Sequence, residues 1–153
     1  MSFKRGRVRP TADLGRKAHF SDYVKAAQLP PPPTSVDNSP KAMNSLTNIY
    51  LNNRLGCCLV SAGYHCEGTW TGNAGNLYNA SDADVIFYYG KIGGYDPNDP
   101  STDQGCDEIT AFDYWIANGF RDGVKPLGYL LVDATSQTHW WCRSGELNSR
   151  FSD

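Results

Sequence analysis

Apolar side chains recur at helical spacing towards the carboxyl end of the chain. Residues 107–118 begin with an acidic turn, place Ile109, Phe112 and Trp115 on one side, and are followed by Gly119. Acidic residues stabilise the amino end of a helix, and glycine commonly ends one. The pattern therefore predicts an amphipathic helix over this stretch.

Two further helices are predicted upstream. Ser81 and Asp84 form a capping-box pair, with Asp in place of the usual Glu, and apolar residues follow until the glycines at 93–94 close the stretch. Residues 57–66 are small and apolar and follow a loop at 52–56. This arrangement predicts a buried helix that is entered from a tight glycine turn.

The remaining pattern predicts strand and loop. Residues 124–132 are rich in apolar side chains and predict a strand. Glycines predict a loop at 69–79, prolines among acidic residues predict a rigid loop at 96–103, and a short helix is expected within 12–27. The sequence thus predicts an α+β fold, with two or three helices around the helix of Cys58, packed on a small antiparallel sheet.

The chain divides into three predicted parts. Residues 1–45 are basic and proline-rich and predict a long extended arm, residues 46–135 form the compact domain, and residues 136–153 form an aromatic tail without a helical or strand period. Four consecutive prolines in the arm must be extended and act as a semi-rigid spacer. They are Pro30, Pro31, Pro32 and Pro33.

Charge is distributed unevenly between the arm and the rest. Residues 1–28 carry seven Lys/Arg and two Asp, giving +5, whereas the remaining seven basic and fourteen acidic residues give −7, for a net charge of −2. A basic arm on an acidic body predicts an acidic partner for the arm. Nucleic acid is expected to bind through the arm at most, because the acidic body repels phosphate. The residues expected to bind partners are Lys4, Arg5, Arg7 and Arg9, the four prolines, and Trp140 and Trp141 of the tail.

Composition argues against a membrane protein and a metal protein. No apolar run approaches the ~20 residues that span a bilayer, and no secretory signal follows the basic start. We therefore expect synthesis in a cytoplasm. Five cysteines without a Cys-x-x-Cys pair favour neither a disulfide framework nor a structural zinc site. Residues 96–103 match a calcium loop only loosely, so no metal and no cofactor is expected.

One cysteine occupies a position suited to catalysis. The amino end of a helix lowers the pKa of a thiol, and a nearby imidazole completes a thiolate nucleophile. Cys58, or its neighbour Cys57, lies at such a helix start. Small helices also bury inert cysteines, so the local pattern leaves both interpretations open.

Several runs, taken in order, make the pattern more specific. They are Asn53-Arg54-Leu55-Gly56-Cys57-Cys58, Ala62-Gly63-Tyr64-His65, Ile92-Gly93-Gly94-Tyr95, Thr102-Asp103-Gln104-Gly105-Cys106, Tyr114-Trp115 with Gly119-Phe120, and Gly128-Tyr129-Leu130 to Asp133. Across roughly residues 3–135 the chain resembles a papain-like cysteine-peptidase-fold family of phages and prophages. That family usually has Gly-Asp before its helix cysteine. Cys57 occupies the Asp position here, so the resemblance implies that Cys58 matches the nucleophile.

The resemblance implies a truncated papain-like half-domain. The family continues into a second half with a Gly-His segment, which supplies the general base, and this chain departs from the family at about Ser136. Papain-like chemistry needs an oriented imidazole within hydrogen-bond reach of the sulfur. His65 follows Cys58 by two helical turns, ~10 Å along the axis, which is too far. His139, with Asn148 to orient it, is the candidate base that is left.

Together these features predict a non-catalytic structural component of a phage virion. It would decorate the capsid, connect head and tail, or form part of the neck, and it would bind neighbouring subunits through its arm. The expected partners are other virion proteins and further copies of the chain. The expected location is the virion, after synthesis in the host bacterial cytoplasm. The alternative is a papain-like cysteine peptidase or amidase with Cys58 as nucleophile.

Overall fold

The computed structural model describes residues 6–8, 19–23, 30–31, 33–120 and 123–129. These residues combine several helices with one small sheet, so the predicted mixture of helix and sheet is confirmed. Among them, no helix has the length and apolar character needed to cross a membrane.

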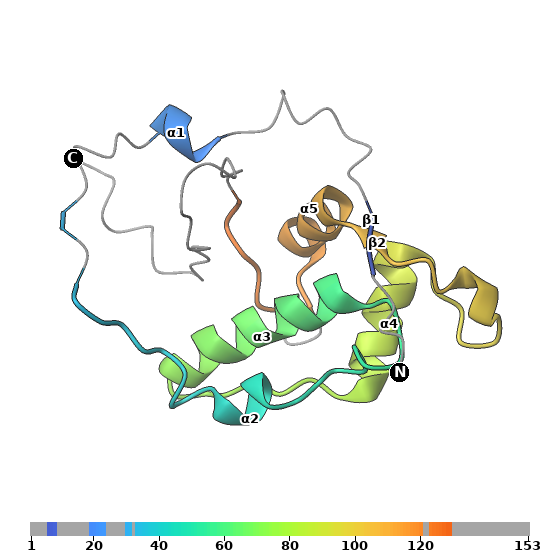
Figure 1. Ribbon diagram of the computed structural model, residues 1–153, viewed down its shortest axis with the longest axis horizontal. Helices are drawn as coiled ribbons and strands as arrows, with labels where there is room; N and C mark the ends of the chain where they lie inside the picture. The colour runs from blue at the N-terminus through green and yellow to red at the C-terminus, as the bar shows by residue number, and fades with distance from the viewer. Residues whose placement is uncertain (1–5, 9–18, 24–29, 32, 121–122, 130–153) are drawn as a thin grey trace.

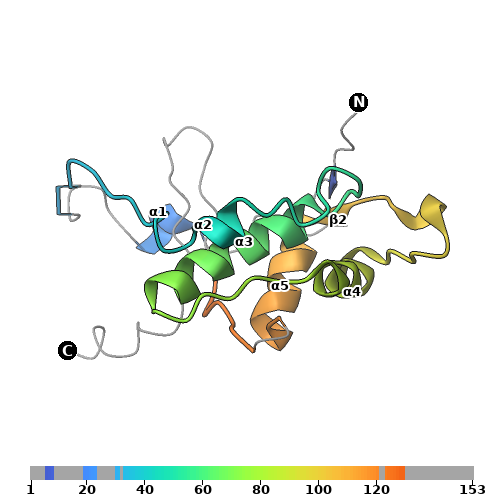
Figure 2. The ribbon, with the colours of Figure 1, turned by 90° about the horizontal axis from the view of Figure 1, so that it is seen from below.

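The longest helix, α3, spans Cys58–Asn73 and forms the centre of the fold (Figure 1). Helices α2 (Met43–Leu46) and α5 (Glu108–Asn118) lie on opposite sides of α3 (Figure 2). Helix α4 (Asp82–Gly93) lies near the amino end of α3. The Cys58 helix is therefore surrounded by three others, as predicted.

Helices α4 and α5 begin at the capping residues that the sequence indicates. The Ser81 hydroxyl accepts from the Asp84 N–H at 3.2 Å, and the Asp84 carboxylate accepts from the Ser81 N–H at 3.1 Å. The Asp107 carboxylate accepts from the N–H groups of Ile109 at 2.7 Å and Thr110 at 3.3 Å. These side chains satisfy amide groups that have no partner within the helix. Both helices end at the predicted glycine stops.

The core is largely aromatic. Tyr64 of α3 lies at its centre, with ring centroids of Tyr50, Tyr78, Tyr88 and Phe120 at 5.6, 6.2, 6.4 and 4.5 Å. Tilted and edge-on ring pairs at such distances contribute ~0.5–1.5 kcal/mol beyond the burial of area. The cluster fixes α3 against α4 and against the segments before α3 and after α5.

The prediction of a loop at residues 69–79 is wrong for its first part, because α3 continues to Asn73. Trp70 of this continuation stacks on Trp115 of α5, with 5.4 Å between centroids and 16° between planes. Gly72 lies against the backbone of Lys41. Tertiary packing thus keeps the glycine-containing end helical, although glycine has a low helix propensity.

The described sheet consists of two short strands, β1 (Arg7–Val8) and β2 (Cys106–Asp107). They run parallel, with Arg7 opposite Cys106. This direction differs from the predicted antiparallel sheet. An isolated antiparallel bridge joins Asp96 and Asp99 in the loop before β2.

The strand predicted at 124–132 does not form over residues 123–129, and the rest of it lies outside the described residues. The segment follows α5 instead. Lys125 Nζ donates to the carbonyl oxygen of Ala117 at 2.8 Å, and the Tyr129 hydroxyl donates to the Asp113 carboxylate at 2.8 Å. These side-chain contacts hold the segment against the helix, and Pro126 within it forms an isolated bridge and not an extended strand.

Parts of the predicted arm are described. Helix α1 (Phe20–Tyr23) falls within the stretch where a short helix was expected. Pro30, Pro31 and Pro33 are exposed and belong to no helix or strand, while Pro32 lies outside the described residues. Residues 6–8 do not extend away but pair with the body through β1.

Tyr64→Phe is expected to raise the free energy of unfolding by about 1 kcal/mol. The Tyr64 hydroxyl is buried and has no hydrogen-bond partner among the described residues, so the substitution removes an uncompensated desolvation cost and keeps the ring. Urea unfolding followed by circular dichroism checks this. Tyr50→Phe is the matched control and should destabilise, because the Tyr50 hydroxyl bonds to Ser45 at 2.6 Å and Asn79 at 2.8 Å. A loss of stability in Tyr64→Phe would contradict the prediction.

Candidate functional site

Cys58 is the first residue of α3, and its side chain is half-buried. Cys57 before it is fully buried, and its thiol lies 3.4 Å from the Tyr50 carbonyl oxygen and 3.5 Å from the Ser61 hydroxyl. Burial raises the pKa of the Cys57 thiol. Of the two neighbours, Cys58 is the thiol that solvent reaches at the helix end.

A third thiol lies near the same helix end. Cys106 of β2 is buried, and its pKa is raised to about 12, first by burial and then by the proximity of Cys58 and Cys57. It therefore stays protonated at neutral pH. Within the described ranges, no three or more Cys, His, Asp or Glu side chains are grouped so as to hold a metal ion.

The turn into α3 is held by the carboxylate of Asp103. Its Oδ1 accepts from the Gly56 N–H at 2.8 Å and from the Tyr89 hydroxyl at 2.7 Å. The Tyr89 hydroxyl accepts in turn from the Gly105 N–H at 2.8 Å. Burial and the bond to Asp103 raise the pKa of Tyr89, which keeps the hydroxyl protonated as a donor. This Asp103 network joins the turn before α3, helix α4 and the loop before β2.

Gly6 of the arm lies directly on this turn. It is buried, and a Cβ at Gly6 would overlap the carbonyl oxygen of Gly56. Gly105 has a φ of 84°, and a Cβ there would overlap the carbonyl oxygen of Gly6. That oxygen accepts from the Cys106 N–H at 2.8 Å. The approach of these backbones requires glycine at both positions.

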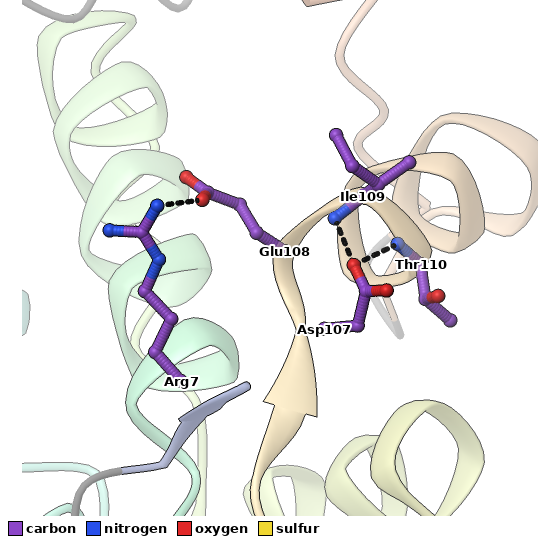
Figure 3. Close-up of polar contacts among 5 residues, drawn as sticks. All are labelled: Arg7, Asp107, Glu108, Ile109 and Thr110. Atoms are coloured by element: carbon purple, nitrogen blue, oxygen red, sulfur yellow. Dashed lines mark hydrogen bonds and ion pairs between the residues drawn. The ribbon is translucent and has the colours of Figure 1, made fainter. Parts of the chain in front are cut away.

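Arg7 contacts the chain's own body. Its Nη2 lies 2.5 Å from Glu108 Oε2, across the β1–β2 pair (Figure 3). The Arg7 side chain is 64% exposed, whereas that of Glu108 is 14% exposed. Asp107, between β2 and α5, caps α5 and faces away from Arg7. The acidic group available to the arginine at this edge is therefore Glu108.

Neither described histidine serves Cys58. His65 Nε2 lies 2.9 Å from the Asn48 carbonyl oxygen, and because a carbonyl only accepts, Nε2 is the donor. The His65 ring packs on Tyr50 at 5.0 Å between centroids, so its described contacts are with the segment before α3. His19 immediately precedes α1, which both views place away from the amino end of α3 (Figures 1 and 2).

Several predicted site residues lie outside the described residues. They include the candidate base and its orienting group, three basic residues of the arm and two aromatic residues of the tail: His139, Asn148, Lys4, Arg5, Arg9, Trp140 and Trp141. The predicted pairing of Cys58 with His139 stays a prediction.

Sequence reasoning missed the Asp103 network and its contact with Gly6. One signal was present, because the dipeptide Gly-Cys occurs twice, at 56–57 and at 105–106. The structure brings these two glycines to the same place, on either side of Gly6. The run 102–106 also contributes to the family resemblance, but nothing local in it indicates that Asp103 reaches the turn before α3.

No family model matches the chain, and neither a curated protein nor a solved structure matches it. The papain-like resemblance therefore rests on the residue runs alone. The function has to be argued from the geometry of the described residues.

Asp103→Ala is expected to lower the free energy of unfolding by about 2–4 kcal/mol. It removes an ionised acceptor of two hydrogen bonds and leaves the Gly56 amide and the Tyr89 hydroxyl without this partner. Urea unfolding measures the loss. Asp96→Ala is the matched control, since the Asp96 side chain bonds within an exposed loop, and it should cost less than about 1 kcal/mol. Equal effects of the two substitutions would show that the network is not a structural constraint.

Proposed function

We propose that the protein is a non-catalytic structural component of a phage virion, built on a truncated papain-like half-domain, that binds neighbouring subunits. The surroundings of Cys58 carry this proposal. A cysteine nucleophile needs an imidazole within about 3.2 Å, and neither histidine in the described segments lies at the amino end of α3. His65 instead donates to Asn48.

The acidic group near this helix end supports the same view. The Oδ1 atom of Asp103 accepts from the Gly56 N–H and from the Tyr89 hydroxyl. A carboxylate engaged in this way holds the turn in position. The site therefore has the features of a structural junction, with a thiol beside it.

An exposed apolar row supports a binding role. Met43 and Leu46 lie one turn apart on α2, and Ile49 follows the helix; their exposed fractions are 47%, 36% and 54%. We call these three residues the α2 row. Neighbouring apolar side chains in contact with water are typical of protein-binding surfaces. In a virion, the row would be covered by another subunit, such as a capsid, connector or neck protein.

Charge favours protein partners over nucleic acid. The body outside residues 1–28 carries −7, which repels phosphate. Arg7, one of the basic residues expected to reach a partner, pairs with a carboxylate of the body. The same pairing is available to a second copy of the chain, so a homo-oligomer within the virion is part of the proposal.

The non-catalytic role is tested with an epoxide inhibitor of papain-like peptidases. We expect no covalent adduct at Cys58 by intact-mass spectrometry after incubation at neutral pH, because an epoxide requires a thiolate activated by an imidazole. An active papain-like peptidase is the positive control. A one-to-one adduct that is lost in both Cys58→Ser and His139→Ala would favour the alternative, a cysteine peptidase or amidase with Cys58 as nucleophile.

The binding role predicts that the purified protein self-associates through the α2 row. Leu46→Glu places a charge in the row and is expected to weaken self-association at least tenfold, as measured by sedimentation velocity. Leu127→Glu is the control, because Leu127 is also exposed, at 57%, and its segment lies on the α5 side of α3. A wild-type protein that stays monomeric at high concentration would count against the proposal.

A further inference from the structure

We propose that Gly56, Gly105, Cys106 and Glu108 form a receptor site for a Gly-Arg segment, and that in the assembled protein this site binds Gly6-Arg7 of a second copy of the chain. We call it the Gly-Arg site. The inference rests on the proposed function, since it names how neighbouring subunits contact one another. In the single chain described here, the site holds the chain's own Gly6 and Arg7.

The site selects glycine by steric exclusion and one hydrogen bond. The carbonyl oxygen of Gly56 occupies the space where a Cβ on the docked residue would lie. From the other side, Gly105 approaches the carbonyl oxygen of Gly6, and the Cys106 N–H donates to that oxygen at 2.8 Å. Any residue with a Cβ would have to move away and break this bond. Glycine alone fits the position.

The next position selects a long cation. Glu108 is 14% exposed and points at the guanidinium of Arg7, while the neighbouring Asp107 is engaged in capping α5 (Figure 3). The parallel register places the residue after the glycine opposite Cys106, which brings its side chain to Glu108. A glycine followed by an arginine is therefore the ligand that these groups recognise, as in peptides that add a strand to a sheet edge.

The docked segment is short and accessible, which suits exchange between copies. Strand β1 has two residues and pairs with β2 on one side, and the side chain of Arg7 and the residue Val8 are 64% and 42% exposed. The same residues in a second copy make identical contacts. Exchange therefore keeps the described contacts of Gly6 and Arg7, and the concentration of neighbouring copies decides between the two arrangements.

The distribution of charge is compatible with contact between copies. Residues 1–28 carry +5 and the rest of the chain −7, so the arm is attracted to the body of another copy as well as to its own. Two copies that exchange arms satisfy both Gly-Arg sites and form a closed two-fold dimer. In a virion, where copies lie side by side at high local concentration, this arrangement prevails over docking within one chain.

Charge reversal separates the two arrangements. Arg7→Glu and Glu108→Arg are each prepared in full-length chains that also carry Leu46→Glu, so that the α2 row does not contribute. Each variant alone places like charges at its own site, and we expect it to be monomeric. Mixed in equal amounts, each arm meets an opposite charge on the other chain. Sedimentation velocity at low ionic strength is expected to show a 1:1 dimer, with at least tenfold tighter association than either variant shows alone.

Two controls complete the experiment. Adding Gly6→Val to both chains is expected to abolish the mixed dimer, because the valine side chain cannot enter the site. The double variant Arg7→Glu, Glu108→Arg in one chain should regain the thermal midpoint that each single variant loses. A mixture that stays monomeric while the double variant regains its midpoint would overturn the exchange and confine docking to a single chain. If the mixed dimer forms but Leu46→Glu does not weaken self-association of the otherwise wild-type protein, the result would instead count against the proposed function.

Discussion

One carboxylate holds together the segments that build the candidate site. Asp103 accepts hydrogen bonds from the turn before α3 and from Tyr89 of α4, and the Tyr89 hydroxyl continues the network to Gly105. Leaving any of these part-buried groups unpaired costs about 1–3 kcal/mol, so the network stabilises the three segments in one arrangement. This constraint positions the turn before Cys58, the surface on which Gly6 docks and the loop that leads into β2.

The parts of the fold that the sequence predicts well are those with short-range causes. Ser81, Asp84 and Asp107 bond to amides two or three residues away, so their patterns predict where α4 and α5 begin. The end of α3 has a long-range cause, because Trp70 stacks on Trp115 from another helix. Counting glycines locally predicts a loop there, and only the packed partner explains the helix.

The candidate site also combines features with short-range causes and features with long-range causes. A glycine turn followed by small residues is enough to place Cys58 at a helix start. Nothing local indicates that Gly6 lies on Gly56, or that Arg7 pairs with Glu108, because the partners are distant in sequence. A two-residue strand carries no alternation of polar and apolar side chains, so the parallel pair of β1 and β2 was beyond prediction.

The catalytic and the structural interpretation place different demands on one helix end. A peptidase needs an activated thiol and a free surface where a peptide backbone can lie beside it. Here Gly6 packs on the turn before Cys58, and its carbonyl oxygen accepts from the Cys106 N–H, so a backbone segment already occupies that turn. A surface that holds an extended segment through backbone contacts suits the proposed structural role, in which it binds a segment of a neighbouring subunit. Occupied by the same segment from another copy, it would join subunits through contacts that the single chain already makes.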